Sequence, residues 1–419
     1  MVRKIELNHI CKVEGHASLS LRIREGKVEE CQLEAMEGAR FFEALVLDKK
    51  LKDVQEIVSR ICGICSTSHS IASIQALENA LNIKPTQNQL VLRKLLLIGE
   101  RIRSHATHLY FLSLPDYLGF SSALTMTKKY GARIDDALKL IRLGNKIIET
   151  FGGREIHPFC DIKKIPIIDR KKILELKREL ENSQQTIKKT IELFLGLKNP
   201  KFERATDYLS LDGEGLISGK IISKSGIIYT EDYKKHLKEN IREYATSKFV
   251  LKDGWPYVTG AIARINNNYQ NLDKESLSYL KKLGKLPLKN PFYNNQCQAI
   301  ELLYLTKKAI EFLDNLKEER IKRGYKIKEG QGISAVEAPR GTLFHEYKIN
   351  KEGKISYCNI IPPTTQNLNM MELDIKNLVN KMLKRNAKKG KIVEEIEKLI
   401  RAYDPCFSCS THFLKVRWL

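Results

Sequence analysis

Long hydrophobic runs are missing from this 419-residue chain, and no segment reaches the roughly eighteen apolar residues that a membrane-spanning helix needs. Its first residues, MVRKIE, lack the apolar core of a secretory signal. We therefore expect a cytoplasmic protein without a membrane span. With 42% hydrophobic and 29% charged residues, the composition is that of a globular chain and not of a disordered one.

Motifs that bind nucleotide cofactors are also missing. No Gly-x-Gly-x-x-Gly run follows an expected strand, no P-loop occurs, and the glycines around Gly213 and Gly215 are poorly placed for either role. There is no dense basic tract with interleaved aromatic residues, so the net charge of +22 does not indicate nucleic-acid binding. The lysine excess is spread over expected helix faces. We interpret it as proteome composition or as a surface for acidic partner subunits.

Four of the nine cysteines form two Cys-x-x-Cys pairs at opposite ends of the chain. Cys62 and Cys65 belong to the run RICGIC, and Cys406 and Cys409 belong to the run DPCFSC. Four soft ligands brought together select a thiophilic transition metal. The pairs alone also allow a structural zinc site or a redox dithiol. More than three hundred residues separate them, which favours a site buried at the centre of a large domain over a zinc ribbon.

The other cysteines are scattered and odd in number, which fits reduced thiols and not a disulfide framework. They do not cluster as iron–sulfur ligands, and they are Cys11, Cys31, Cys160, Cys297 and Cys358. Electrons released at a buried metal site would therefore need a carrier in another subunit.

The hydrophobic pattern predicts a mainly helical α+β protein. Alternation near the amino end predicts a hairpin that turns at Gly26, and a second hairpin is expected with Glu352 and Gly353 in its turn. Pro405 is expected to end the last helix and to present both nearby cysteines on a loop. The expected helices are 89–112, 141–151, 169–197, 294–323, 370–386 and 390–403.

We expect one large domain without internal repeats. Its expected parts are a β-hairpin region at 1–40, a helical core at 41–200, a β-rich insertion at 205–265, more helical core with the carboxyl-terminal metal loop at 294–412, and a tail at 413–419.

Three further segments place charged residues beside glycine or proline. Residues 12–16 (KVEGH) contain Glu14, residues 38–43 (GARFFE) contain Glu43, and residues 337–341 (EAPRG) contain Arg340. Each has an ordinary interpretation when taken alone. The first could be a helix cap or a surface charge, the second a surface ion pair, and the third a clamp on backbone carbonyls.

Taken in order with the two cysteine pairs, these segments resemble the large subunit of nickel–iron hydrogenases over nearly the whole chain. The sequence is most similar to the soluble cytosolic branch, which includes the archaeal sulfhydrogenase type and the methanogen enzymes. Residues 38–43, 114–117 (LPDY) and 401–406 (RAYDPC) carry this closer similarity. The resemblance implies a central bundle of long helices with peripheral β-hairpins. It also implies reversible, heterolytic cleavage of dihydrogen.

The resemblance also implies roles for the cysteines. Cys62 and Cys406 would be terminal thiolates on nickel, and Cys65 and Cys409 would bridge nickel to an iron that carries CO and cyanide. Thiolates suit nickel because they are soft donors, and the shell would leave one coordination position open. The proton would pass first to the Cys406 thiolate and then to the carboxylate of Glu14.

Other residues match the family's site by position. Glu43 and His412 correspond to the ligands of a buried magnesium or iron ion, and Arg340 to a guanidinium held over the open position. His69 corresponds to a hydrogen-bond donor to a bridging sulfur.

Two histidines have no settled role from the sequence. His105 and His108 are either satisfied within the core or part of the hydrogen-bond network around the site. Ser104 stands where respiratory uptake hydrogenases often have an acidic residue, and Lys12 stands where many relatives have arginine.

The resemblance implies several partners. They are an iron–sulfur small subunit, further subunits that deliver electrons to NAD(P) or a deazaflavin, and an endopeptidase that cleaves between His412 and Phe413. The alternatives are a non-catalytic hydrogenase-like subunit of a redox complex and a zinc-stabilised structural protein. The first usually loses the four cysteines, all of which are present here.

Overall fold

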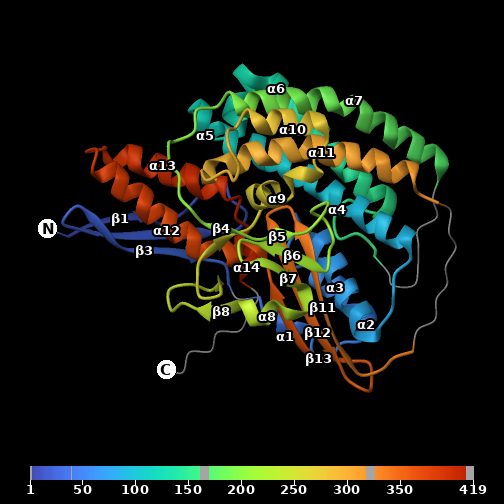
Figure 1. Cartoon of the computed structure of the whole chain (residues 1–419). Coiled ribbons are helices and arrows are strands. Elements are labelled where there is room, and N and C mark those ends of the chain that lie inside the picture. The colour runs from blue at the N-terminus through green and yellow to red at the C-terminus, as the bar shows by residue number, and fades with distance from the viewer. Residues whose placement is uncertain (1, 39, 161–168, 318–325, 412–419) are drawn as a thin grey trace.

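A bundle of long helices forms one half of the molecule. The computed structural model describes residues 2–38, 40–160, 169–317 and 326–411. Figure 1 shows the long helices together in its upper half, and they pack on one another. They are α4 (Gln87–Thr107), α6 (Ala123–Gly152), α7 (Arg170–Leu195) and α11 (Asn294–Asp314).

Helix α4 is the central member of this bundle. It starts with a capping box, in which the Gln89 amide donates to Oγ1 of Thr86 at 3.2 Å and the Thr86 amide donates back to Oε1 of Gln89 at 2.8 Å. Both hydrogen bonds satisfy amides that the first helical turn would otherwise leave without a partner. The helix continues into a π-helical stretch (His108–Ser113) and then into α5 (Leu114–Leu118).

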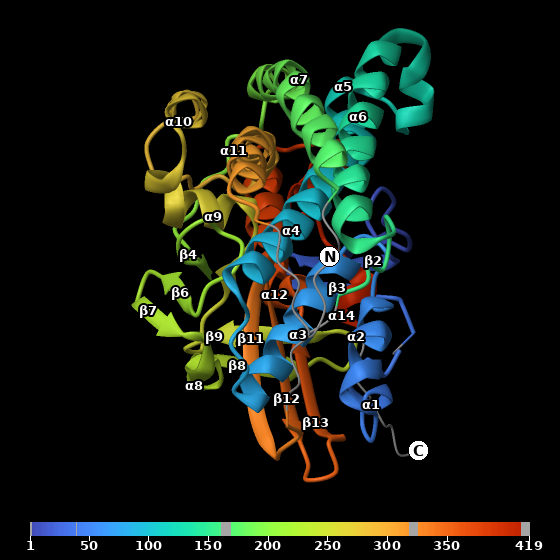
Figure 2. The ribbon, with the colours of Figure 1, turned by 90° about the vertical axis from the view of Figure 1, so that its right-hand side faces the viewer.

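A three-stranded antiparallel sheet supports the other half. Its order is β11 (Gly330–Ala338), β12 (Gly341–Ile349) and β13 (Ile355–Ile361). Helix α3 (Ser66–Leu81) lies on this sheet, as Figure 2 shows.

The contact between α3 and β11 is close because the strand carries glycine there. A Cβ built on Gly332 would lie 1.9 Å from the carbonyl oxygen of Ala76, so no other residue fits. Further along the strand, Ser334 donates to the carbonyl of Ala72 at 2.6 Å. The helix therefore runs antiparallel to the strand, and its amino end reaches the turn between β11 and β12.

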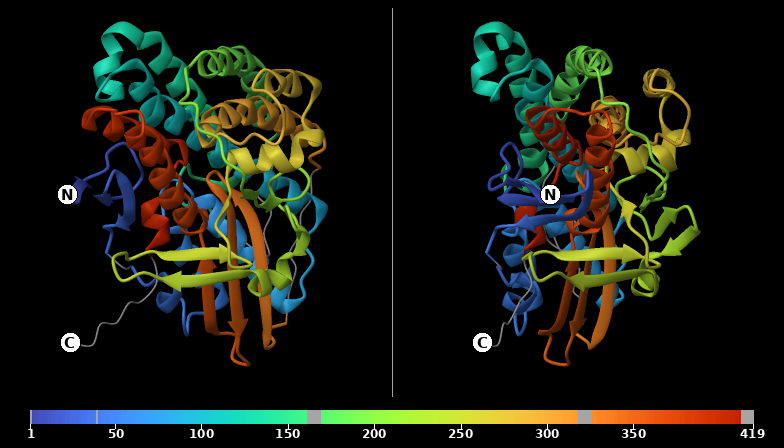
Figure 3. Two further views of the ribbon diagram at one scale, coloured as in Figure 1. Left: turned by 60° about the vertical axis from the view of Figure 1, so that its left-hand side comes forward. Right: turned by 90° about the vertical axis from the view of Figure 1, so that its left-hand side faces the viewer.

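A second antiparallel sheet is made of β1 (Val2–Leu7), β2 (Ala17–Arg24) and β3 (Lys27–Ala35). It packs on α12 (Pro363–Leu383), and Figure 3 shows the two side by side. The predicted hairpin with its turn at Gly26 is confirmed. The loop between β1 and β2 carries Glu14.

The remaining elements surround these two halves. The helices are α1 (Phe42–Leu45), α2 (Leu51–Ser59), α8 (Tyr233–His236), α9 (Ala261–Asn268), α10 (Lys274–Lys281), α13 (Lys389–Ala402) and α14 (Phe407–Ser410). The strands are β4 (Asp207–Tyr208), β5 (Ser210–Leu211), β6 (Lys220–Ser223), β7 (Gly226–Tyr229), β8 (Leu237–Ile241), β9 (Lys248–Lys252) and β10 (Tyr257–Val258).

Several expected boundaries were wrong. The expected β-rich insertion ends in helix α9, α11 stops at Asp314 instead of 323, and α12 begins seven positions earlier than 370. Strand β11 was not expected at all. Cys409 lies in the short helix α14 and not on a loop.

One hydrophobic cluster extends from Ile5 to Cys409 and includes all four cysteines of the two pairs. Among the described helices, none combines the length and the apolar character of a membrane span.

Candidate metal centre

The two cysteine pairs meet in the interior. The Sγ atoms of Cys62 and Cys406 are 3.5 Å apart, those of Cys65 and Cys409 are 3.0 Å apart, and all four lie within 4.8 Å of one another. All four side chains are buried. Four thiols gathered this closely in an apolar interior would strand their charge if ionised alone, so the donor set fits a soft transition metal.

Helix α4 fixes the amino-terminal pair. Cys65 is the N-cap of α3, and the carboxylate of Glu100 accepts hydrogen bonds from the amides of Thr67 at 2.7 Å and Ser68 at 3.2 Å. Arg103 donates to the carbonyl of Ile64 at 2.8 Å. One turn of α4 therefore holds both the cysteine loop and the start of α3. Burial raises the pKa of Glu100.

The carboxyl-terminal pair is held by two other segments. The Cys406 amide donates to Oγ1 of Thr364 at 2.8 Å, and the Phe407 amide donates to the carbonyl of Glu14 at 2.9 Å. Glu14 and Cys406 form an isolated parallel β-bridge. The residue pair before Cys406 turns the chain inward, with Asp404 in a left-handed conformation (φ 50°) ahead of Pro405.

The carboxylate of Glu14 reaches the thiol of Cys406. Its Oε2 atom is 2.8 Å from Sγ of Cys406 and accepts from the amide of Ser408 at 3.2 Å. Burial, together with the negative charge of Cys62, raises the pKa of Glu14. A carboxyl group in this position can exchange a proton with a cysteine ligand.

Arg340 lies in the two-residue turn that joins β11 to β12, between the paired residues Ala338 and Gly341. Its Nη2 is 3.1 Å from Asp404, and it lines a small cavity with His69, Cys406 and Cys409, among others. Within the described residues, Nε and Nη1 of Arg340 have no hydrogen-bond partner. Burial alone would lower the pKa of this guanidinium, but Asp404 and the cysteine sulfurs raise it.

His69 lines the same cavity as Cys65 and Cys409. Its Nδ1 is 3.0 Å from Nε2 of His345, and Nδ1 of His345 is 2.7 Å from the hydroxyl of Tyr347. A chain of polar groups therefore orients the His69 ring from behind. The sequence did not indicate His345.

Glu43 lies in a cluster around an ammonium group. Nζ of Lys248 is 2.9 Å from Glu43, 2.9 Å from Glu239 and 3.3 Å from Oδ1 of Asn359. The Ile360 amide also donates to Glu43 at 2.9 Å. Its expected partner, His412, lies outside the described residues.

The two histidines of α4 and the π-helical stretch are both buried and paired. Nε2 of His105 is 2.8 Å from Glu301, and burial lowers the pKa of His105 to about 4. Nε2 of His108 is 2.7 Å from the carbonyl of Arg401, and its Nδ1 is 2.5 Å from Oε1 of Gln298. His108 therefore tethers the segment before Asp404, while His105 joins a network behind Arg340.

The family model of nickel-dependent hydrogenases matches residues 40–147 and 221–412. The chain belongs to this family. The hydrogenase resemblance and the enzyme class expected from the sequence are thereby confirmed, and members of the nickel-dependent hydrogenase family are oxidoreductases.

Curated relatives of the family match over almost the full chain. The sulfhydrogenase 1 alpha subunit of Pyrococcus furiosus is 36% identical, with 98% of both chains covered. The sulfhydrogenase 2 alpha subunit of the same organism is 35% identical, covering 98% of this chain and all of that one. A polypeptide of the vhc F420-non-reducing hydrogenase of Methanococcus voltae is 27% identical, covering 98% of this chain and 95% of that one.

A solved structure of an NAD+-reducing [NiFe]-hydrogenase in the H2-reduced state superposes with a TM-score of 0.87. Identity is 23%, and 98% of this chain and 99% of that one are covered. The expected hydrogenase large-subunit fold is thereby confirmed.

Several residues of the site had no signal in the sequence. Glu100, Arg103, Lys248 and His345 act through partners that are distant along the chain. The only visible hint was charge in otherwise apolar helices, which for α4 could have drawn attention to Glu100 and Arg103.

Proposed function

We propose that this chain is the catalytic large subunit of a cytoplasmic nickel–iron hydrogenase. The observation that carries the proposal is the carboxylate of Glu14 placed 2.8 Å from one sulfur of a buried four-cysteine cluster. A structural zinc site needs no proton acceptor at a ligand, whereas cleavage of dihydrogen releases protons that must leave.

Within this proposal, Cys62 and Cys406 hold nickel, and Cys65 and Cys409 are shared with an iron that carries CO and cyanide. The centre, when bound, supplies the heterolytic cleavage of dihydrogen into protons and electrons. The protein supplies the soft donors and an apolar surrounding that keeps water away from them.

The protein also moves the proton. Cys406 accepts it first, and Glu14 takes it from the sulfur, because the two side chains are in contact. The raised pKa of Glu14 brings it closer to neutrality, which favours both uptake and release of a proton.

Arg340 supplies a fixed positive charge beside the cavity. Asp404 holds one end of its guanidinium, and Gln298 in turn donates to Asp404 at 2.9 Å. The two nitrogens of Arg340 without partners among the described residues are available to a small substrate. His69, which lines the same cavity, would donate to a bridging sulfur.

We further propose that Glu43 and His412 bind a magnesium or iron ion. The support is the set of oxygen atoms from Glu43, Glu239 and Asn359 that now surrounds the ammonium of Lys248. Oxygen donors of this kind prefer hard cations.

Partner subunits complete the proposal. Apart from the four cysteines at the centre, the described residues contain no other group that could hold a metal cluster, so electrons must pass to an iron–sulfur partner and on to NAD(P) or a deazaflavin. All nine cysteines are free, which fits a reducing cytoplasm. The continuous hydrophobic cluster supports one domain.

Maturation would end with removal of residues 413–419 by an endopeptidase. The closing segment is already tied to the amino-terminal part, since the Arg40 amide donates to the carbonyl of Thr411 at 2.8 Å and its guanidinium contacts the carbonyl of Ser408.

Metal analysis and dihydrogen uptake of the purified complex test the function. We expect nickel with iron and measurable uptake, both lost when Cys406 is replaced by serine, because a hydroxyl is a hard, poorly ionised ligand. Cys31→Ser, outside the cluster, serves as the matched control and should retain both. Zinc as the sole metal would contradict the proposal and favour a structural protein. Nickel and iron without turnover would favour a non-catalytic role.

A further inference from the structure

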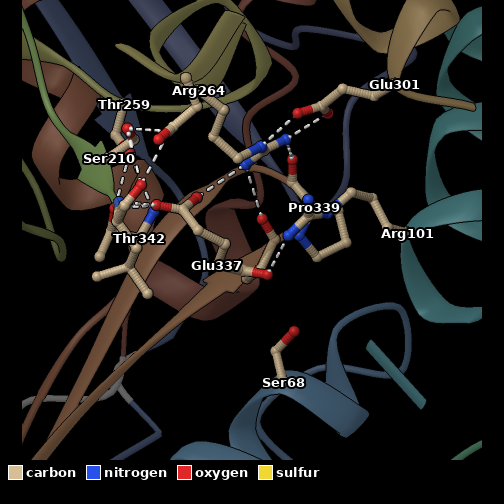
Figure 4. A network of polar contacts seen from close by, with 12 residues as sticks. Ser68, Arg101, Ser210, Thr259, Arg264, Glu301, Glu337, Pro339 and Thr342 are labelled. Atoms are coloured by element: carbon tan, nitrogen blue, oxygen red, sulfur yellow. Dashed lines mark hydrogen bonds and ion pairs between the residues drawn. The ribbon is translucent and has the colours of Figure 1, made fainter. Parts of the chain in front are cut away.

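Behind the turn that carries Arg340 lies a second buried arginine, Arg264 of helix α9 (Figure 4). Two of its N–H groups donate to the carboxylate of Glu301, at 2.6 and 2.7 Å, and a third donates to Glu337 at 2.9 Å. The last two donate to backbone carbonyls, of Ala338 at 3.1 Å and of Pro339 at 3.0 Å. All five donors of this guanidinium are therefore used.

The same stretch of backbone is bound by another arginine. Nη2 of Arg101 donates to the carbonyl of Glu337 at 2.6 Å. Three consecutive carbonyls, those of residues 337, 338 and 339, thus each accept from a guanidinium. Arg340 follows directly, and its own guanidinium keeps two nitrogens without a protein partner among the described residues.

Helix α9 also contacts the turn through its first residues. A Cβ on Gly341 (φ 133°) would lie 2.4 Å from Oγ1 of Thr259, and the Thr342 amide donates to that oxygen at 3.0 Å. At the same end of α9, Asn294 accepts from the Ile262 amide at 2.9 Å and donates to the carbonyl of Ala402 at 2.8 Å. One helix therefore ties the Arg340 turn to the segment that leads to Asp404.

The charges of the network balance without Arg340. Burial would raise the pKa of Glu301, but Arg264 lowers it, so the carboxylate stays ionised. Nearby, His105 stays neutral, because burial lowers its pKa to about 4. Glu301 and Glu337 then match Arg264 and Arg101. The charge of Arg340 is left to face Asp404 and the cysteine sulfurs.

We propose that Arg264 is a positioning residue for the hydrogenase reaction: it holds the backbone before Arg340 so that this guanidinium stays fixed beside the four-cysteine cavity. The proposal rests on the function proposed for Arg340. Lysine cannot replace Arg264 in this role, because an ammonium has three donors and no planar fork, so it cannot bind two carboxylates and two carbonyls at once.

The first test is amide hydrogen exchange, measured by mass spectrometry on the full-length chain without metal. In Arg264→Lys we expect the amides of residues 341–343 to exchange at least about tenfold faster than in the wild type, because local opening becomes easier. Arg93→Lys is the matched control, since Arg93 is equally buried and forms a bidentate pair with Glu78 at 2.6 and 2.7 Å away from the turn. Unchanged exchange in Arg264→Lys would overturn the proposal.

The second test is a double-mutant cycle on kcat of the assembled, metal-loaded enzyme. We expect Arg264→Lys to lower kcat by about tenfold, since small misplacements of a catalytic group are costly. In an Arg340→Lys background the same change should lower kcat by less than about twofold, because the group that it positions is already lost. Equal losses in both backgrounds would show a purely structural role and would overturn the proposal.

The two failures remain distinguishable. If Arg340→Lys has wild-type kcat, the function proposed for Arg340 fails, while the exchange measurement still decides whether Arg264 fixes the turn. If Arg264→Lys does not fold, Glu301→Gln takes its place in both tests, because it keeps the size of the side chain and removes the charge that orients Arg264. Faster exchange at 341–343 is again the supporting result, and unchanged exchange the contrary one.

Discussion

A carboxyl group buried in contact with a thiol, as Glu14 is with Cys406, can transfer a proton only if it can ionise. We expect Glu14→Gln to keep nickel and iron but to lose at least about a hundredfold in hydrogen–deuterium exchange, because the amide carries no exchangeable acid proton. Infrared bands of CO and cyanide should remain. Glu29→Gln, on the exposed edge of the neighbouring sheet, is the control. Unchanged exchange in Glu14→Gln would mean that the proton leaves by another route.

His105 gives a prediction about pH. Its folded-state pKa is lowered from 6.5 to about 4, so the unfolded chain binds this proton more readily than the folded one. This group therefore costs no stability above pH 6.5 and destabilises the fold progressively as the pH falls from 6.5 towards 4. We expect the free energy of unfolding to fall over this range by about 3 kcal/mol more in the wild type than in His105→Gln. Denaturant titrations at several pH values measure it, and parallel pH profiles of the two proteins would contradict it.

At the scale of elements, the packing of α3 on β11 places Cys65 beside the Arg340 turn. Gly332→Ala would bring a Cβ to 1.9 Å from the carbonyl of Ala76 and push the helix away from the strand. We expect a loss of about 1–3 kcal/mol in the free energy of unfolding, together with reduced nickel content. Gly390→Ala in α13 is the control, because a Cβ there meets no atom within 4 Å. Equal stability of both variants would show that α3 does not depend on this contact.

How well the elements could be predicted depended on where they are buried. Helix α7 was predicted closely, because it exposes one polar face and its hydrophobic period is clear. Helix α9 and strand β11 are mostly buried, and such elements lose the amphipathic pattern that marks a helix or a strand. The early start of α12 was missed because polar residues at its amino end, such as Thr364 and Asn367, are buried and bind backbone groups of distant segments.

The site shows the same division. The two cysteine pairs, Glu14 and Arg340 stand in short motifs, so they could be named before their positions in space were known. Arg264 could not, because its partners lie 37 to 75 positions away along the chain. A sequence read without related sequences carries no trace of such contacts.

At the scale of the whole molecule, the chain must close around its centre. We expect active enzyme to contain a large subunit that ends at His412, because a tail with Lys415 and Arg417 could not be buried with the closing segment without stranding two charges. Intact mass spectrometry of the active complex measures this. The unprocessed chain, isolated from cells without the endopeptidase, is the control and should lack nickel-dependent turnover. Full activity with Leu419 still present would contradict the prediction.

The meeting of the two cysteine pairs has a consequence for synthesis. The cysteines of each cross-pair stand 344 positions apart, so a nascent chain exposes its first thiols long before the ribosome has made their partners. At about 5–20 residues per second, that interval lasts roughly 17 to 70 s. During this time Cys62 and Cys65 lie at the end of an unfinished fold, open to oxidation and to the wrong metal. The cell must therefore guard these thiols during translation or reduce them afterwards, and a chain truncated before Cys406 can never hold the centre.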